Sequence, residues 1–316
     1  MSIRVTILGS GGTYPTPERG LPAIAVRMPG RLYLLDCGGC TQRQIFKSKL
    51  KIGPLTHIFI THLHGDHIFG VFGLLQTLTL LDRQKPLYIV GPEGIRSLIE
   101  EVGRWTWLKP SYELSVIEVR DERVFEFDTH YVRLFPVNHG VPAFGIVVEE
   151  KPRPGRLDVE KADRLGVPVH LRKRLQLGKA VRTPSGRVVH PEEVLGEAKP
   201  GRKVVYTGDT SPCDRVVREA KGANLLIHDS MYLVGDEKLA EEGVHSSYRD
   251  ACEVAELCGV GLLLLTHFSP RYRNKDIEEA EEAAKKYFPR VVACRDFTTV
   301  EIDFSGACRV VEAGMR

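Results

Sequence analysis

The sequence lacks any run of apolar residues long enough to cross a membrane, because no stretch approaches the roughly 18 uncharged residues that a span needs. Its first residues contain too short an apolar run for a signal peptide and no small-residue cleavage site. We therefore expect no membrane span and, by default, a cytoplasmic location. The 316 residues are 42% apolar and 27% charged, which is the balance of an ordinary globular protein.

Cysteines are few and scattered. There are seven, an odd number, which does not suit the disulfide framework of a secreted protein. Cys37 and Cys40 have the C-x-x-C spacing of thiol redox proteins, but the small redox domain that this motif requires is missing. We therefore expect two small residues in a tight turn after the strand-like run 32–36. No Ser- or Cys-based catalytic triad stands out either.

The net charge of +3 conceals an uneven distribution along the chain. Residues 152–203 hold 13 Lys and Arg against 6 Asp and Glu, a balance of +7. The remainder holds 31 against 35, a balance of −4. This asymmetry indicates a localised contact with a polyanion.

Two similar halves of short strands and helices are predicted on either side of this basic segment. Strand-like runs occur at 5–8, 23–27, 31–36, 57–61, 87–90, 115–119, 131–137, 145–149, 204–207, 225–228, 262–266, 290–293 and 298–302. Helical runs occur at 68–81, 94–102, 248–257 and 277–288. We expect stacked sheets with helices outside, built from residues 1–150 and 204–316. Residues 151–203 are predicted to be an insertion with one short helix at 159–165.

A cluster of metal-ligand side chains lies between the strand-like run 57–61 and the helical run that follows. It contains His62, His64, Asp66 and His67. Alternate residues of an extended segment face the same side, so His62 and His64 can bind one metal together. Asp66 and His67 fall at the helix entrance and point to a neighbouring position. Four such side chains in six residues exceed what one zinc ion needs from one loop.

His139, Asp209 and His267 each stand at the carboxyl end of an apolar run. Taken alone, each histidine fits an ordinary hydrogen-bonded role, and Asp209 fits a turn or a helix N-cap. Together with the cluster at 62–67, they complete a set of seven ligands for two metal sites. Strands lying side by side would bring these strand ends together.

Two metal ions would suit the hydrolysis of a phosphodiester. An aspartate that bridges two zinc ions leaves a position for a shared water, whose pKa zinc lowers towards about 7. Two ions roughly 3.5–4 Å apart also offset the charge that develops at phosphorus. Histidine and carboxylate ligands suit zinc, and they also admit manganese, cobalt or iron.

The chain resembles the ribonuclease Z family of the metallo-β-lactamase superfamily, beginning with its H-x-H-x-D-H run. The similar motifs are residues 8–19, 36–38 with 41–44, 208–213 and 266–272. The resemblance implies an α/β four-layer αβ/βα sandwich with an inserted basic arm. It also implies an endoribonuclease that removes 3′ trailers from precursor tRNA and leaves a 3′-hydroxyl on the tRNA. A homodimer is implied as well.

The same resemblance implies a role for each site residue. One zinc ion is assigned to His62, His64 and His139, the second to Asp66, His67 and His267, and Asp209 bridges the two. Asp66 is implied as the acceptor of a proton from the attacking water. His245 is implied as the donor of a proton to the leaving oxygen, although on sequence alone it could equally be an exposed loop histidine.

The resemblance also implies that the insertion grips the tRNA elbow, since similar enzymes carry a protruding arm there. Arg172, Lys173 and Arg174 form its sharpest basic cluster, for which the alternative is a solvated loop. Residues 167–174 depart from the Gly-Pro-rich segment that many members have at this point. Gly39 and Cys40 stand where an acidic residue and a glycine are usual.

Two rival functions remain open on the sequence. A small-molecule phosphodiesterase or arylsulfatase-like hydrolase of the same fold would need no basic segment. A non-catalytic RNA-binding subunit would not need all seven ligands.

Overall fold

The computed structural model describes residues 2–312. The chain forms two compact units. Unit 1 comprises the chain up to Phe125, Val132–Val148 and the chain from Arg202 onwards. Unit 2 comprises Glu126–Tyr131 and Glu149–Gly201, and therefore holds residues 151–201 of the predicted insertion. Among residues 2–312, no helix is both long and apolar enough to span a membrane.

The first sheet has eight strands and is mixed. Its order is β17 (Cys308–Glu312), β16 (Thr299–Ile302), β1 (Ile3–Gly9), β2 (Ala23–Met28), β3 (Arg31–Leu35), β4 (Leu55–Phe59), β5 (Leu87–Pro92) and β6 (Leu114–Val119). Strands β3 to β6 are parallel, and β1, β2 and β3 pair antiparallel. Because both faces are covered, β3 and β4 are buried along almost their whole length instead of alternating between buried and exposed residues.

The second sheet has seven strands. Its order is β15 (Val291–Ala293), β14 (Leu262–Thr266), β13 (Leu225–Asp229), β12 (Lys203–Tyr206), β9 (Phe144–Glu150), β8 (His130–Pro136) and β7 (Arg123–Glu126). Strands β12 to β15 are parallel, so their carboxyl ends lie at one edge. This is the edge at which open α/β sheets bind ligands.

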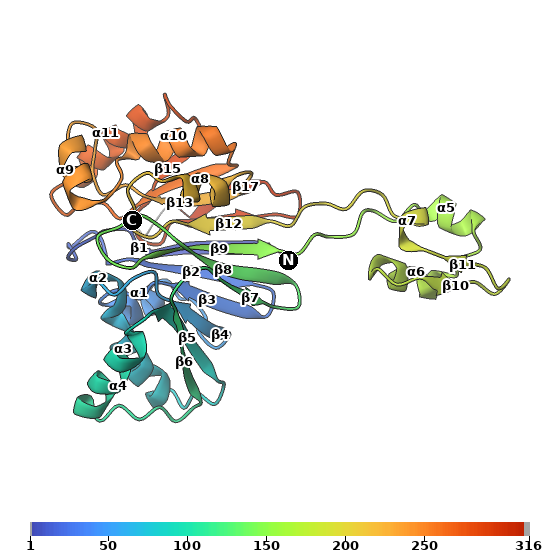
Figure 1. Cartoon of the computed structure of the whole chain (residues 1–316), viewed down its shortest axis with the longest axis horizontal. Helices are drawn as coiled ribbons and strands as arrows, with labels where there is room; N and C mark the ends of the chain where they lie inside the picture. The colour runs from blue at the N-terminus through green and yellow to red at the C-terminus, as the bar shows by residue number, and fades with distance from the viewer. Residues whose placement is uncertain (1, 313–316) are drawn as a thin grey trace. The chain divides into compact units, whose positions relative to one another are not determined.

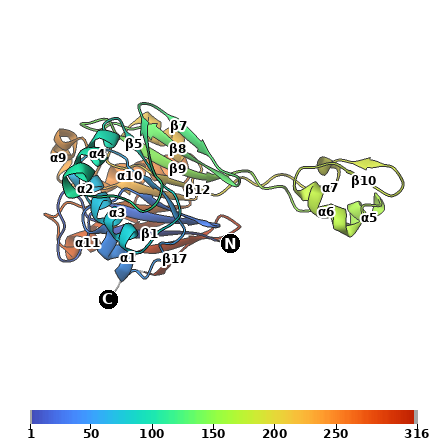
Figure 2. The ribbon, with the colours of Figure 1, turned by 90° about the horizontal axis from the view of Figure 1, so that it is seen from below.

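Helices cover the outer face of each sheet, which gives four layers (Figures 1 and 2). Helices α1 (Thr41–Lys47), α3 (Gly70–Leu80) and α4 (Ile95–Thr106) pack with the first sheet in one apolar core. Helices α8 (Asp214–Ala220), α10 (Tyr248–Cys258) and α11 (Asn274–Ala284) pack with the second sheet in another. The predicted αβ/βα sandwich is confirmed.

Several short elements of unit 1 were not predicted. The helix expected at 68–81 is divided into α2 (Gly65–Ile68) and α3, with Phe69 between them. Helices α1, α8 and α9 (Glu237–Gly243) and strands β7 and β17 were missed. These elements have four to seven residues, which is too short to display a helical or strand period clearly.

Unit 2 contains more structure than the single helix predicted for the insertion. It holds α5 (Val159–Arg164), α6 (Val169–Gln176), α7 (Pro191–Val194) and the small hairpin of β10 (Val181–Arg182) and β11 (Val188–Val189). Its own core consists of Ala162, Val167, Leu175, Val181, Val189 and Val194. The helix predicted at 159–165 is confirmed as α5. The other elements were missed because each buries only one or two apolar side chains, which leaves no periodicity to detect.

Candidate metal centre

The seven predicted ligands come together in unit 1. His62, His64, Asp66 and His67 follow β4, and the others follow strands of the second sheet. Asp209 follows β12, and His267 comes directly after β14. The ends of strands from both sheets therefore meet at one site.

The first group consists of His62, His64, His139 and Asp209, which each offer one atom within 4.8 Å of the others. Nδ1 of His64 lies 3.0 Å from Nε2 of His62 and 3.3 Å from Nε2 of His139. Nε2 of His62 lies 3.6 Å from Oδ2 of Asp209. Three ring nitrogens and a carboxylate oxygen thus surround one position, which is a donor set that suits a metal ion.

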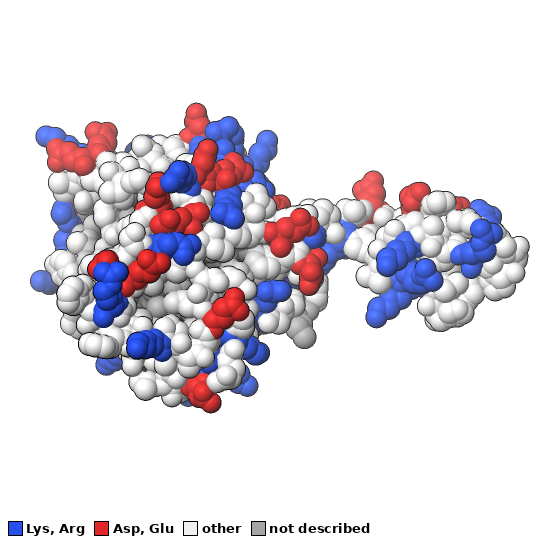
Figure 3. All heavy atoms as spheres, turned by 60° about the horizontal axis from the view of Figure 1, so that its bottom comes forward, with Lys and Arg blue, Asp and Glu red and all other residues white. Residues whose placement is uncertain are grey.

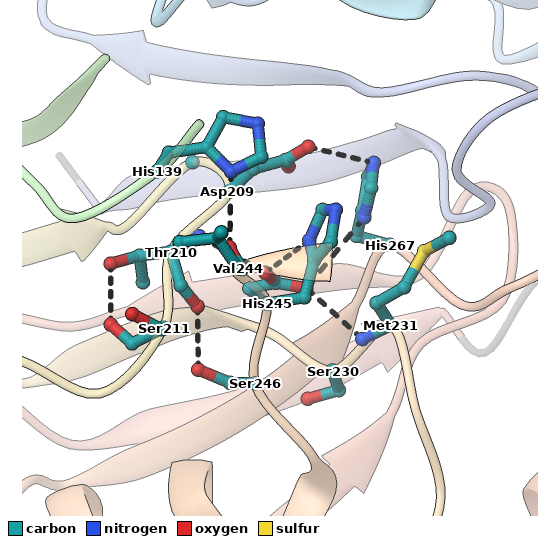
Figure 4. A network of polar contacts seen from close by, with 12 residues as sticks. His139, Asp209, Thr210, Ser211, Ser230, Met231, Val244, His245, Ser246 and His267 are labelled. Atoms are coloured by element: carbon teal, nitrogen blue, oxygen red, sulfur yellow. Dashed lines mark hydrogen bonds and ion pairs between the residues drawn. The ribbon is translucent and has the colours of Figure 1, made fainter. Parts of the chain in front are cut away.

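The second group consists of Asp66, His67 and His267. The Nε2 atoms of His67 and His267 are 3.3 Å apart, and each lies 3.3 Å from Oδ2 of Asp209. Oδ2 of Asp66 lies 3.5 Å from Nε2 of His267. Asp209 therefore borders both groups. Figure 4 shows it with His139 of the first group and His267 of the second.

The carboxylate of Asp209 is suited to bind a cation. Its Oδ1 is buried and has no hydrogen-bond partner among the described residues. A buried carboxylate oxygen without a partner is costly, and a divalent cation is the group that best satisfies it here. The donor chemistry of both groups fits a divalent metal.

Charges in the metal-free site are balanced by protons on two histidines. Burial opposes the charge of Asp209, but His267 and His67 hold the pKa of its carboxyl well below the usual range. Burial also opposes protonation of His267, yet Asp209 raises its pKa to about 10. Asp209 and Asp36 likewise overcome burial and raise the pKa of His67. By contrast, burial lowers the pKa of His62 to about 2.

Outer partners orient the ligand rings. Nδ1 of His67 lies 2.7 Å from Oδ2 of Asp36, which also accepts a hydrogen bond from the hydroxyl of Tyr206 at 2.9 Å. Nδ1 of His139 donates to the carbonyl oxygen of Val244 at 3.0 Å (Figure 4). Each contact turns the opposite nitrogen, Nε2, towards the site. Asp36 and Tyr206 were not predicted as site residues.

His245 lies beside the metal-ligand groups and is tied to Asp229. Its Nδ1 is 2.8 Å from Oδ2 of Asp229, and its ring stacks on His267 with centroids 5.3 Å apart. The side chain is only 12% exposed, so the exposed-loop alternative was wrong. Burial opposes its protonation, but Asp229 raises the pKa of the His245 imidazole.

The sequence carries a signal for the positions of Asp36 and Asp229, although not for the histidines that they contact. Asp36 directly follows β3, and Asp229 is the last residue of β13, so both stand at the end of an apolar run, as Asp209 and His267 do. Their roles were not predicted, because they depend on contacts with His67 and His245, which lie far from them along the chain.

The glycine-rich loop before β2 forms a wall of the site. The backbone N–H of Thr13 donates to Oδ2 of Asp66 at 2.7 Å. A Cβ on Gly12 would lie 2.6 Å from the His267 ring, so only glycine fits there. Tyr14, Phe69 and His245 line a cleft of about 510 Å³ beside these residues. A substrate group can therefore reach the ligands from this side.

The C-x-x-C motif forms the turn that was expected instead of a redox pair. Burial raises the pKa of the Cys37 thiol to about 12, whereas Cys40 is exposed, and neither forms a disulfide. Gly38 between them packs against the backbone of Asp66, where a Cβ would lie 2.2 Å from its carbonyl oxygen. The motif thus packs against the segment that carries His62, His64, Asp66 and His67.

The three basic residues predicted for RNA binding differ in their surroundings. All lie on α6 of unit 2. Arg172 forms an ion pair with Asp163 and is only 15% exposed, so it serves the structure of unit 2. Lys173 and Arg174 are exposed, and no ion pair engages them in the described part of the chain.

Two helix-covered sheets with histidines and aspartates at their strand ends define a metallo-β-lactamase-type fold. The Beta-lactamase superfamily domain matches residues 31–268. The chain is 39% identical over 303 residues to Ribonuclease Z of Methanosarcina acetivorans, covering 96% of this chain and 99% of that one. It is 42% identical over 301 residues to Ribonuclease Z of Methanothermobacter thermautotrophicus, covering 95% and 97%.

A solved structure agrees with these relatives. The short form of human tRNase Z superposes with a TM-score of 0.70 at 29% identity, covering 95% of this chain and 100% of that one. The chain belongs to the ribonuclease Z family.

Proposed function

We propose that this chain is a metal-dependent endoribonuclease that removes 3′ trailers from precursor tRNA. The observation that carries the proposal is the pair of ligand groups that border a single carboxylate, Asp209. Such an arrangement suits cleavage of a phosphodiester by water without a protein nucleophile. Family membership supports RNA over a small-molecule ester as the substrate.

The proposed metal content is two zinc ions. His62, His64 and His139 would hold one, Asp66, His67 and His267 the other, and Asp209 would contact both. When bound, the metals supply a water of lowered pKa and positive charge close to the reacting phosphate. Nitrogen and oxygen donors without thiolate also admit manganese, cobalt or iron.

Asp66 is proposed to accept the proton that the attacking water loses. Its Oδ2 is fixed by the N–H of Thr13 at 2.7 Å, which holds the carboxylate beside the ligand groups. Burial works against its charge, but His267 and His67 lower its pKa, so the carboxylate is ionised and able to accept. As the water oxygen bonds to phosphorus, the bond from phosphorus to the tRNA 3′ oxygen breaks.

His245 is proposed to donate a proton to that leaving 3′ oxygen. Asp229 holds its Nδ1 and raises its pKa, which favours the protonated imidazole that a proton donor needs. The remaining ring nitrogen, Nε2, can then donate to the departing oxygen. The products are a tRNA with a 3′-hydroxyl and a trailer with a 5′-phosphate.

Unit 2 is proposed to bind the tRNA away from the cut. Residues 152–201 hold 11 Lys and Arg against 6 Asp and Glu, and Figure 3 shows basic side chains in groups on this unit. The whole unit holds only 12 against 10, because Glu126, Asp128, Glu149 and Glu150 belong to it as well. Lys173 and Arg174 are the exposed cations that we assign to backbone phosphates.

A homodimer in the cytosol is proposed as the working state. The family resemblance implies the dimer, and light scattering of the purified protein would measure it directly. The seven unpaired cysteines and a precursor tRNA substrate suit a reducing compartment.

The function is tested by mapping the ends that the protein produces on a 3′-extended precursor tRNA. We expect one cut at the 3′ end of the tRNA body, with a 3′-hydroxyl and a 5′-phosphate. Asp66→Ala should lower kcat at least about a hundredfold, because both proton transfer and a ligand are lost. A fully active Asp66→Ala protein with native circular dichroism would refute the assignment of Asp66.

A further inference from the structure

Two hollows in unit 1 continue from the catalytic cleft over α1. The first, of about 690 Å³, shares Pro15 with the cleft and is also lined by Cys40, Arg43 and Lys47. The second, of about 660 Å³, shares Lys47 and Phe297 with the first. Shared lining residues therefore connect the cleft to the far end of α1 in two steps.

These hollows are strongly basic although most of the chain outside residues 152–203 is slightly acidic. The second is lined by Arg4, Arg27, Lys47, Lys49 and Lys51, with no acidic residue in its wall. One of these, Arg4, pairs with Glu301. Residues 37–65, which include α1, contain no Asp or Glu at all. Positive charge is thus concentrated here locally.

Most of this charge is not neutralised by the protein. Arg43, Lys47, Lys49 and Lys51 are exposed, and none forms an ion pair within residues 2–312. The first hollow does contain two carboxylates, Glu18 and Asp296. Asp296 already accepts hydrogen bonds from the Ser10 and Gly20 backbone N–H groups and is largely buried. The exposed cations are therefore available to external anions.

Aromatic side chains accompany the cations. Tyr14, in the wall of the catalytic cleft, is 58% exposed, and Phe46 on α1 is exposed to the same extent. A positive path with exposed aromatic rings is the combination by which proteins bind single-stranded nucleic acid without reading its sequence. In that binding mode, the phosphates of the nucleic acid contact the cations, and its bases stack on the aromatic rings.

We propose that Arg4, Arg27, Arg43, Lys47, Lys49 and Lys51, here called the α1 track, bind the single-stranded 3′ trailer of the precursor. This inference rests on the proposed function, because it requires an RNA strand that is cut in the cleft and continues from there along the α1 track. Contacts to phosphates suit a trailer whose sequence varies from one precursor to another. The α1 track lies entirely in unit 1 and is a different surface from the basic residues of unit 2.

The test compares two precursors with the same tRNA body, one with a trailer of two nucleotides and one with twelve. Lys47→Gln, Lys49→Gln and Lys51→Gln are combined in one variant. The matched control combines Lys85→Gln, Lys109→Gln and Lys221→Gln, which are exposed and line neither hollow. The control removes the same net charge.

For the track variant we expect KM to rise about tenfold for the long trailer and less than about twofold for the short one. The slope of log KM against log salt for the long trailer should fall by about 0.7 for each phosphate that the variant no longer binds, or about 2 in total. The control variant should match the wild type on both substrates. These differences separate the contribution of trailer contacts to KM from that of contacts with the tRNA body.

Equal increases for both trailers would overturn the proposal, because the cations would then contact the tRNA body or support the fold. An unchanged KM would overturn it as well. If the wild type cuts neither precursor, the proposed function fails instead. Anisotropy of a labelled twelve-nucleotide oligouridylate then still tests the track, with weaker binding expected only for the track variant.

Discussion

At the scale of single residues, the site is a set of charges that must be balanced. The sequence was sufficient to nominate the seven candidate ligands, because all of them lie in segments that follow a strand. It did not reveal Asp36 and Asp229, whose role depends on which histidine each one meets in space. Asp36 and His67 are 31 positions apart, and Asp229 and His245 are 16 apart. Such separations leave no local sequence pattern that would reveal the pairs.

Metal uptake should release protons. In the metal-free site His67 and His267 have raised pKa values, about 10 for His267, so both are protonated at pH 7. A metal can bind only the deprotonated nitrogens, so the affinity should rise with pH up to the pKa of these groups. Calorimetry of zinc binding in buffers of different ionisation enthalpy should give release of about two protons at pH 7. Release of none would contradict this charge balance.

The same shifts have a consequence for the metal-free protein. Because the folded-state pKa of His267 is raised above its unfolded value, its contribution to stability is present at acidic pH and is lost as pH rises towards about 10. Metal removal by a chelator should therefore lower the melting temperature more at pH 9 than at pH 7. Scanning calorimetry at both values checks the sign.

Asp229→Asn should shift the pH profile of cleavage. Asp229 raises the pKa of His245, and a proton donor is active only while it is protonated. Loss of the carboxylate should move the alkaline limb of kcat to lower pH and reduce kcat at pH 8 about tenfold or more. His245→Ala should remove that limb. An Asp229→Asn profile that overlays the wild type would show that the pair does not act in proton transfer.

At the scale of elements, strand ends could be predicted better than the loops that support them. The long apolar runs of β4, β12 and β14 identified the edge where the site lies. Short α1 and the loop before β2 carry no clear period, and their positions depend on hydrogen bonds to a distant residue, Asp296. Most elements of the insertion were not predicted for the same reason, because its core is built from single apolar residues scattered along the chain.

Asp296 should act on catalysis through this loop. Its carboxylate accepts from the N–H groups of Ser10 and Gly20 and from Nε2 of Gln44, which joins both ends of the loop to α1. The loop carries Thr13, whose N–H holds Asp66. Asp296→Ala leaves the two backbone donors unpaired, and we expect about 1–3 kcal/mol of lost stability and a lower kcat.

A local measurement separates loss of loop positioning from destabilisation of the whole protein. Hydrogen exchange of residues 10–20 should accelerate in Asp296→Ala, while the metal content stays at the wild-type value. Ser10→Ala removes one of the same contacts, a hydroxyl bond of 2.9 Å, and should give a smaller effect in the same direction. Uniformly faster exchange across both sheets would instead indicate a loss of the whole fold.

At the scale of the whole molecule, we assign catalysis to unit 1 and binding of the tRNA body to unit 2. All seven candidate ligands, together with Asp229 and His245, belong to unit 1. Unit 2 has its own apolar core and contributes none of them. The charge excess along the chain pointed to a polyanion contact, but it could not reveal the separate basic hollows over α1, since those combine residues from β1, β2 and α1.

Excision of residues 155–198 should separate the two activities. The two connecting segments lie side by side, because Arg153 and Lys199 pair through their backbones. A short glycine-serine linker can therefore close the gap without strain on unit 1. Hydrolysis of a nitrophenyl phosphodiester should stay within about twofold of the wild type, whereas kcat/KM for precursor tRNA should fall at least about a hundredfold. A parallel loss of both activities would make unit 2 a structural element.

The central claim is that strand ends of unit 1 hold two metal ions that share Asp209, and anomalous diffraction at the zinc edge tests it most directly. We expect two peaks per chain, with one at about 2.0–2.2 Å from ligand atoms of His62, His64 and His139. The other should lie equally close to Asp66, His67 and His267, with an Asp209 oxygen near both. A single peak, or a metal held by other residues, would contradict the account.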